Sequence, residues 1–434
     1  MKMNDIAELL NMTATERDIR EAVTDEHGVL YSEDGTFLLE CRNKDLKHYT
    51  VRKGCKVICE KAFFNRHPFA CILEDIMLPD GLLAIGNAAF MTCGKLRNIV
   101  MPQSLRYIGE SAFELCHSLE QITLPSGLRA MGGNPLADSG VKKVVCMSPH
   151  FNVVDGCLMQ DNKMVAFLSN RKLCHIPSGT REIGSEAFSN NNHLHSLILP
   201  EGLEEIGDNA FMGCTLQSLS IPSSVRKIGD NPFAFATVRT LEVKGTNFSF
   251  KNGFLVSDKG VLVAYMGALS EVVVPETVSE IGGGAFYKNK VIRSVTLPTQ
   301  LKTIRHHAFA QCENLRELHI PEGVSRLGEG AFEGCQSLRY LTLPPRLSFI
   351  DDSLFANSGI EELSIPEGVT YIGKSAFTFC THLHTIRIPE SVTHIDDCAF
   401  FVCEKLTEIA ILNRNIRLGA HAFDHFYAIR DKIG

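Results

Sequence analysis

The feature that most constrains this chain is a short motif that recurs along almost its whole length. It appears at 275–286 as Pro-Glu-Thr-Val-Ser-Glu-Ile-Gly-Gly-Gly-Ala-Phe. It returns at 321–332 as Pro-Glu-Gly-Val-Ser-Arg-Leu-Gly-Glu-Gly-Ala-Phe and at 366–377 as Pro-Glu-Gly-Val-Thr-Tyr-Ile-Gly-Lys-Ser-Ala-Phe. A unit this short cannot bury its apolar side alone. Successive copies must therefore stack into a solenoid with a continuous core.

The final Phe of the motif is the anchor from which each copy is numbered. Most anchors are 22 or 23 residues apart, whereas three intervals span 27, 52 and 53 residues. Leu136 takes the place of Phe in one copy. The chain thus contains 14 copies, anchored at Phe63, Phe90, Phe113, Leu136, Phe188, Phe211, Phe233, Phe286, Phe309, Phe332, Phe355, Phe377, Phe400 and Phe423.

The pattern inside a copy predicts two short strands followed by a turn. Apolar residues alternate over few positions, which favours half-buried strands over an amphipathic helix. Pro stands eleven residues before the anchor in 12 copies and should end the first strand. Gly stands four before the anchor in 10 copies, which predicts a tight turn with positive φ; Arg305 departs from this pattern and should be strained or differently turned. The Ala-Phe segment that follows is expected to form about one helical turn.

The run Leu-x-x-Ile-x-Ile-Pro-x-x-Val-x-x-Ile-Gly-x-x-Ala-Phe-x-x-Cys, nearly complete at 383–403, resembles the BspA-type leucine-rich repeat family. The resemblance covers about residues 52–423. It implies an α/β repeat fold: a right-handed leucine-rich-repeat solenoid of about 14 coils, β-rich with short helical turns. It also implies a protein-binding role, and many members of the family are secreted or surface adhesins of bacteria and some protists.

The long intervals contain a second repeated unit, a β-hairpin. Asp34-Gly35 lies between two apolar runs, and similar segments occur at 151–162 and 248–260. The first 27 residues, with Ile6, Leu9, Leu10, Ile19 and Val23, are predicted to be a helical cap; a docking arm for a partner is the alternative. The predicted organisation is an N-terminal helical cap (1–27), a hairpin unit (28–51), repeat block 1 (52–146), a hairpin insert (147–173), block 2 (174–243), a second insert (244–271) and block 3 with a C-terminal cap (272–434).

Charge and cysteine content limit the partners and the compartment. The net charge is −7, from 43 basic and 50 acidic residues that are well mixed, so nucleic acid is not an expected partner. No apolar run is long enough for a membrane span, and Asp5 and Glu8 interrupt any signal-peptide core. Fifteen cysteines with no export signal favour a reducing, cytoplasmic location, although stacked thiols would be within disulfide reach. The family resemblance implies the alternative, a cell-surface or secreted protein.

No motif indicates an enzyme, a metal site or a cofactor. Gly282-Gly283-Gly284 looks like a phosphate loop but occupies the turn of an ordinary copy. Cys55 and Cys59 likewise occupy repeat positions, and seven other cysteines sit three residues after an anchor, where we expect a small core filler. The pairs His193/His195 and His382/His384 could chelate a metal, but solvated strand-end positions are the simpler interpretation. A cryptic catalytic or metal site remains as a third hypothesis.

Equivalent positions on stacked coils form stripes, and one stripe is predicted to bind a partner. In the last block the position six before the anchor is occupied in turn by Glu280, Thr303, Arg326, Phe349, Tyr371, His394 and Arg417. Aromatic and Arg side chains are enriched at binding hot spots. We therefore predict a non-enzymatic protein-interaction scaffold that binds through Arg326, Phe349, Tyr371, His394 and Arg417, with Tyr340 nearby on the other strand. The alternatives are that the aromatic rings only cover neighbouring coils, and that the protein is an exported adhesin or glycan-binding module.

Overall fold

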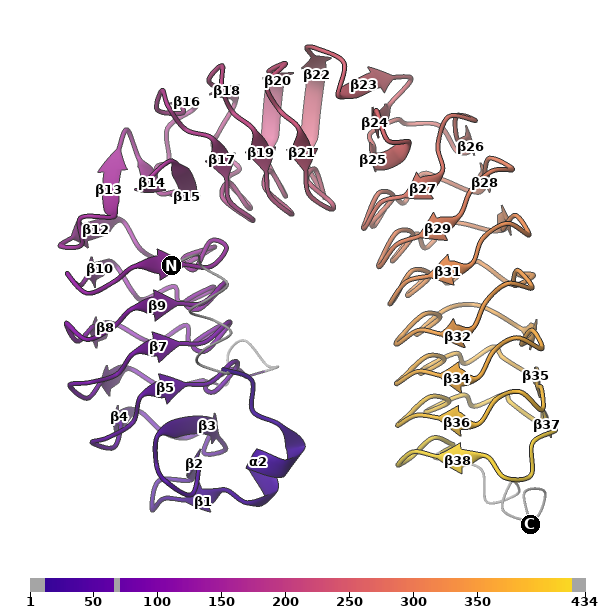
Figure 1. Ribbon diagram of the computed structural model, residues 1–434, viewed down its shortest axis with the longest axis horizontal. Helices are drawn as coiled ribbons and strands as arrows, with labels where there is room; N and C mark the ends of the chain where they lie inside the picture. Colours follow the sequence, from indigo (N-terminus) through magenta and orange to yellow (C-terminus); the bar gives the residue numbers. More distant parts are fainter. Residues whose placement is uncertain (1–11, 66–70, 424–434) are drawn as a thin grey trace. The chain divides into compact units, whose positions relative to one another are not determined.

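The computed structural model describes residues 12–65 and 71–423. It has two compact units: unit 1 is Met1–Gly229 with Ala236–Glu242, and unit 2 is Asp230–Phe235 with Val243–Gly434. Within each unit the chain winds into a β-solenoid of stacked coils (Figure 1). The helix α2 (Glu16–Arg20) is the only one in the described part of the chain.

Each coil contributes a two-residue strand immediately before its turn, here called the second strand. The second residue of each pair is the apolar residue five before the anchor, and Ile58, Ile304 and Ile372 are fully buried. Neighbouring second strands pair in parallel, as Ile281 does with Ile304. The described residues contain one second strand for each anchor. These second strands are β5 (Val57–Ile58), β7 (Ala84–Ile85), β9 (Tyr107–Ile108), β11 (Ala130–Met131), β17 (Glu182–Ile183), β19 (Glu205–Ile206), β21 (Lys227–Ile228), β27 (Glu280–Ile281), β29 (Thr303–Ile304), β31 (Arg326–Leu327), β32 (Phe349–Ile350), β34 (Tyr371–Ile372), β36 (His394–Ile395) and β38 (Arg417–Leu418).

The first strands form separate parallel sheets. The first strands end just before the proline, as expected, because β28 ends two residues before Pro298 and β30 ends two residues before Pro321. The first strands are β4 (His48–Thr50), β6 (Asp75–Met77), β8 (Asn98–Val100), β10 (Gln121–Leu124), β12 (Lys143–Cys146), β16 (Leu173–His175), β18 (Ser196–Ile198), β20 (Thr215–Ile221), β22 (Thr237–Val243), β26 (Glu271–Val273), β28 (Ser294–Thr296), β30 (Glu317–His319), β33 (Glu362–Ser364), β35 (Thr385–Ile388) and β37 (Glu408–Ile411).

Three antiparallel meanders each begin a sheet of second strands. The turns Asp155-Gly156 and Asn252-Gly253 have positive φ at both residues, which is the type I′ geometry of tight hairpins. The last strand of each meander then pairs in parallel with a second strand, so the solenoid has slightly more turns than the 14 anchors. The block boundaries proposed above stay a prediction. The meanders are β1 (Val23–Thr24), β2 (Val29–Tyr31) and β3 (Phe37–Cys41); β13 (Phe151–Val154), β14 (Cys157–Gln160) and β15 (Lys163–Phe167); and β23 (Phe248–Lys251), β24 (Phe254–Ser257) and β25 (Val261–Tyr265).

The turn differs from its predicted form in two respects. Positive φ occurs two residues before and two residues after the anchor, as at Ala88 and Thr92 around Phe90, and this segment is a pair of turns rather than a helical turn. The recurrent Gly four before the anchor does not have positive φ. Arg305 occupies that position and is likewise absent from the residues with positive φ, so the strain expected there from a left-handed turn does not arise.

Close packing between coils explains the glycine instead. A Cβ placed on Gly86 would lie 2.6 Å from the backbone nitrogen of Glu60, and one on Gly328 would lie 2.5 Å from that of His306. Such distances are shorter than van der Waals contact. Glycine is therefore present because the backbone of the preceding coil approaches too closely for a side chain.

This explanation predicts that two glycines of the same coil respond differently to alanine. Gly86→Ala should cost about 1–3 kcal/mol of unfolding free energy, because overpacking forces the backbone to shift. Gly94→Ala should have little effect, because the nearest atom to its Cβ would be 3.7 Å away. Urea unfolding of both variants measures the difference. Equal stability of the two variants would contradict the packing explanation.

The core is organised around a column of anchor rings. Successive Phe rings stack with centroids between 4.8 and 5.7 Å apart, from Phe63 to Phe113 and again from Phe286 to Phe423. Each of these rings packs on the equivalent ring of the next coil, and one buried cluster extends from Val29 to Ala166 in unit 1 and another from Phe254 to Ala422 in unit 2.

The described part of the N-terminal segment lies against the second strands of block 1. Met12 and Leu30 belong to one buried cluster, and Ala14, Ile19 and Ala22 pack against it. The carbonyl of Met12 accepts a 2.7 Å hydrogen bond from the backbone nitrogen of Glu60. Val23 is in β1 and largely exposed. Ile6, Leu9, Leu10 and the predicted C-terminal cap beyond residue 423 lie outside the described residues.

Candidate functional site

Four of the predicted site residues occupy one row in unit 2. Phe349, Tyr371, His394 and Arg417 are the first residues of β32, β34, β36 and β38, and each pairs with the next in parallel register. Because the residue that follows in β32, β34 and β36 is buried in the core, Phe349, Tyr371 and His394 lie on the outer face of the sheet. Phe349, Tyr371 and His394 are half-buried and Arg417 is exposed. We call Phe349, Tyr371 and His394 the aromatic ladder.

Two rings of the ladder, those of Tyr371 and His394, are held in place by contacts with each other and with Asp396. Tyr371 and His394 stack with centroids 5.4 Å apart and an interplanar angle of 8°. The Tyr371 hydroxyl donates a hydrogen bond to the Asp396 carboxylate. This bond raises the pKa of Tyr371 and lowers the pKa of Asp396. The ladder therefore presents a preorganised surface, which reduces the entropy that binding must overcome.

A polar hollow lies on the same face, over the coils that precede the ladder and contain β27, β29 and β31. Its volume is about 620 Å³. Arg305 crosses it, bonding to Glu280 and lying 3.3 Å from an oxygen of Asp230. Arg326 lines this hollow and belongs to β31, which ends one sheet, whereas Phe349 begins the next in β32. The hollow is lined by Glu280, Thr303, Arg305, His306, Arg326, Gly328, Glu329 and Asp351.

Tyr340 does not belong to the row of the ladder. It forms a parallel bridge with Glu362, in the coil that begins the first-strand sheet β33-β35-β37. Its side chain is 66% exposed, and its hydroxyl donates a 3.0 Å hydrogen bond to Glu361. First and second strands form different sheets, so Tyr340 is not part of the row, and its contact with the ladder stays a prediction.

The equivalent row in block 1 is buried. Val57, Ala84, Tyr107 and Ala130 stand six before their anchors, pair in register and are at most 5% exposed. They share one apolar cluster with Met12, against which Ile19 packs. The outer face of the second strands therefore accepts a peptide segment in unit 1. Sequence reasoning missed this contact, although the apolar residues of this row were a signal for it.

The other sequence candidates lie outside the aromatic ladder. Cys55 and Cys59 are buried, and the Cys55 thiol donates to the carbonyl of Val57. His193 is exposed, and Nδ1 of His195 lies 2.7 Å from the His193 carbonyl. Across residues 12–65 and 71–423, no group of three or more His, Cys, Asp or Glu side chains is arranged to hold a metal ion. In the same residues, no helix has the length and apolar character needed to cross a membrane.

Comparison with known proteins identifies the family. The sequence matches the BspA type leucine rich repeat region over residues 40–165, 166–255, 264–323 and 302–430. A solved leucine-rich repeat protein from Eubacterium ventriosum is 17% identical, with a TM-score of 0.52 and coverage of 91% of each chain. A leucine-rich cell surface protein from Faecalibacterium prausnitzii is 23% identical, with a TM-score of 0.43 and coverage of 90% of this chain and 94% of that chain.

At these identities the solved structures show the fold alone. No curated protein was found to be similar to this chain. The family match extends over most of the sequence and includes the anchors of every block. The chain belongs to the BspA-type leucine-rich repeat family.

Proposed function

We propose that the protein is a non-enzymatic scaffold that binds another protein through the outer face of its second strands in unit 2. The contact surface consists of the aromatic ladder, flanked by Arg326 and Arg417. The observation that carries this proposal comes from block 1, where the row of second strands shares one apolar cluster with Met12, and Ala14 and Ile19 pack against it. The aromatic ladder is the corresponding row of unit 2.

The chemistry of the surface indicates the kind of segment that binds. In unit 1 the described part of this segment contributes apolar side chains, including Met12, Ala14 and Ile19, and a backbone hydrogen bond from Glu60 to Met12. Flat aromatic rings in unit 2 suit similar apolar side chains, and aromatic and Arg residues concentrate binding energy. Arg326 and Arg417 favour carboxylates at either end of the segment. We therefore expect an apolar peptide segment of a partner protein, bordered by acidic residues.

The test is capture of partners from native-cell lysate by wild type, a ladder variant and a matched control. The ladder variant is Phe349→Ser with Tyr371→Ser. The control is Phe379→Ser, because Phe379 is 49% exposed in the same unit and lies two residues after an anchor, outside the ladder. A protein retained by wild type and by the control, but lost by a ladder variant with an unchanged circular dichroism spectrum, is the expected result.

Two outcomes would contradict the proposal. Retention of the same proteins by the ladder variant would place binding on another surface. Loss of folding in the ladder variant would show that the rings serve to cover neighbouring coils. Specific capture that resists both substitutions, but is removed by free sugars, would favour the alternative of an adhesin or glycan-binding module.

The cellular location stays a prediction with two alternatives, the cytoplasm and the cell surface. All fifteen cysteines are free thiols in the structure. A count of free thiols in protein isolated from its native host separates the alternatives, because an exported chain is exposed to oxidising conditions.

A further inference from the structure

Six of the seven cysteines that follow an anchor by three residues have one shared role. Where a cysteine follows the anchor by three residues, its thiol donates to the carbonyl of the anchor in the preceding coil, at 3.0–3.2 Å in six cases. Burial raises the pKa of these thiols, to about 12 for Cys335 and about 11 for Cys380. A buried thiol that remains protonated is a poor nucleophile. These six cysteines are Cys116, Cys214, Cys312, Cys335, Cys380 and Cys403.

The start of the repeat departs from this arrangement. The first copy has Arg66 at the cysteine position, and its longer interval to the next anchor contains Cys71. The Cys71 sulfur lies 3.2 Å from that of Cys93, whereas Cys93 is 3.7 Å from the carbonyl of Phe63. Cys93 thus contacts a second thiol in addition to the usual carbonyl.

We propose that Cys71 and Cys93 form a reversible disulfide when the protein meets a hydroperoxide. The Cys71 thiolate attacks the peroxide oxygen, the O–O bond breaks, and the leaving alkoxide or hydroxide takes a proton from water. Cys71 is then a sulfenic acid. The Cys93 sulfur attacks the Cys71 sulfur, the S–O bond breaks, and water leaves with the Cys93 proton. The two thiols lose two electrons in total, which reduce the peroxide to an alcohol or water.

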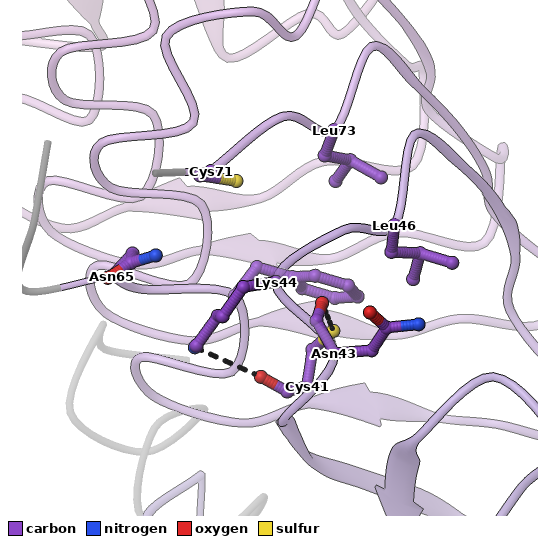
Figure 2. Close-up of a pocket in the computed structure, with 8 residues that line it drawn as sticks. Cys41, Asn43, Lys44, Leu46, Asn65, Cys71 and Leu73 are labelled. Carbon is purple, nitrogen blue, oxygen red and sulfur yellow. Dashed lines mark hydrogen bonds between the residues drawn. The ribbon is translucent and has the colours of Figure 1, made fainter. Parts of the chain in front are cut away.

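Access to the thiol supports Cys71 as the residue that reacts first. Cys71 is partly exposed, whereas Cys93 is fully buried. Figure 2 shows Cys71 and Leu73 on one side of a small cavity, with Cys41 and Lys44 on the other. The cavity has a volume of about 10 Å³, which is close to the space that one water molecule needs. A small oxidant can therefore approach Cys71 but not Cys93.

The surrounding groups also favour a thiolate at Cys71. The hydrogen bond between the two thiols and, more weakly, the charge of Lys44 lower the pKa of Cys71 to about 7, against the effect of burial. The hydrogen bond to Cys71 and burial both raise the pKa of Cys93. The thiols of Cys41 and Cys116 also face this pair. Cys71 is thus the nucleophile and Cys93 the resolving thiol.

A second pair of thiols provides an internal comparison. The sulfurs of Cys157 and Cys174 are 3.6 Å apart, but the two residues are 0% and 2% exposed. Proximity is therefore similar in the two pairs, and access to the oxidant differs. We expect the Cys157–Cys174 pair to stay reduced until the protein unfolds.

The test treats fully reduced protein with hydrogen peroxide, blocks remaining thiols with an alkylating reagent and maps the peptides by mass spectrometry. The expected product is a cross-link between Cys71 and Cys93 that a reducing agent reverses. Its initial rate should rise with pH up to about 7 and level off above, following the thiolate fraction of Cys71. The rate is measured at pH values where the circular dichroism spectrum is unchanged.

Variants assign the two roles. Cys93→Ser should let Cys71 accumulate as a sulfenic acid that dimedone traps, and Cys71→Ser should leave Cys93 reduced. Cys335→Ser, the control in the carbonyl-bonded column, should leave the cross-link unchanged. Equally fast oxidation of Cys157 and Cys174 in folded protein, or recovery of Cys71 as a free thiol after treatment, would overturn the proposal.

Discussion

Replacing Phe332 by alanine is expected to lower the free energy of unfolding by about 3–5 kcal/mol, which is the range for deletion of a fully buried aromatic ring. Phe332 is 0% exposed and stacks on both Phe309 and Phe355, with centroids 5.7 Å apart in each case. The substitution removes apolar contacts with two neighbouring coils and leaves a cavity in the middle of the column. Urea denaturation followed by circular dichroism measures the loss.

Leucine provides the matched control, because Leu136 occupies the anchor position in one natural coil. Phe332→Leu keeps most of the buried volume and should cost less than half as much as Phe332→Ala. If the two variants were equally stable, the coils would have to close over the missing ring, and the stacked column would not be a main source of stability.

Unit 1 is expected to become less stable as the pH rises from 5 to 8. Burial, together with the charges of Glu114 and Glu110, raises the pKa of Glu186 from 4.5 to about 7. Burial is also the first cause of the raised pKa of Glu114, which is half-buried. Between pH 4.5 and 7 the folded protein therefore holds more protons than the unfolded chain, and the slope of stability against pH is negative. The stabilisation is fully present below this window and lost above it, with at most about 3 kcal/mol from Glu186.

Measurement of the unfolding free energy at several pH values checks this expectation. Glu186→Gln should flatten the profile, because the amide cannot ionise and keeps a similar size. Glu33→Gln is the control, since Glu33 is exposed in the same unit and its substitution should leave the slope unchanged. A profile that is flat or rises over this range in wild type would show that Glu186 and Glu114 are better solvated than their positions indicate.

Much of the coil could be predicted because it depends on nearby residues. The apolar residue five before the anchor, the proline that ends the first strand and the ring at the anchor all act within one coil or between adjacent copies. Gly86 shows where this reasoning was wrong. Its position was predicted, but the reason is the backbone of Glu60 rather than a left-handed conformation. Backbone contact between coils cannot be inferred from the residues of one coil.

The candidate surface was predicted only in part, for a similar reason. The row from Phe349 to Arg417 follows from the repeat period, since equivalent positions align when coils stack. Tyr340 was expected near the row from the other strand; first and second strands lie in different sheets, so this contact stays a prediction.

The sequence by itself determined the stacked coils, their buried column of rings and the face on which the aromatic ladder lies, because a repeated pattern specifies repeated contacts. Only the tertiary structure decided which part of that face is covered and which thiols meet. Met12 reaches Glu60, and Cys71 reaches Cys93, through segments that lie outside the repeat. Contacts of such segments depend on how the whole chain packs and have no period from which they could be predicted.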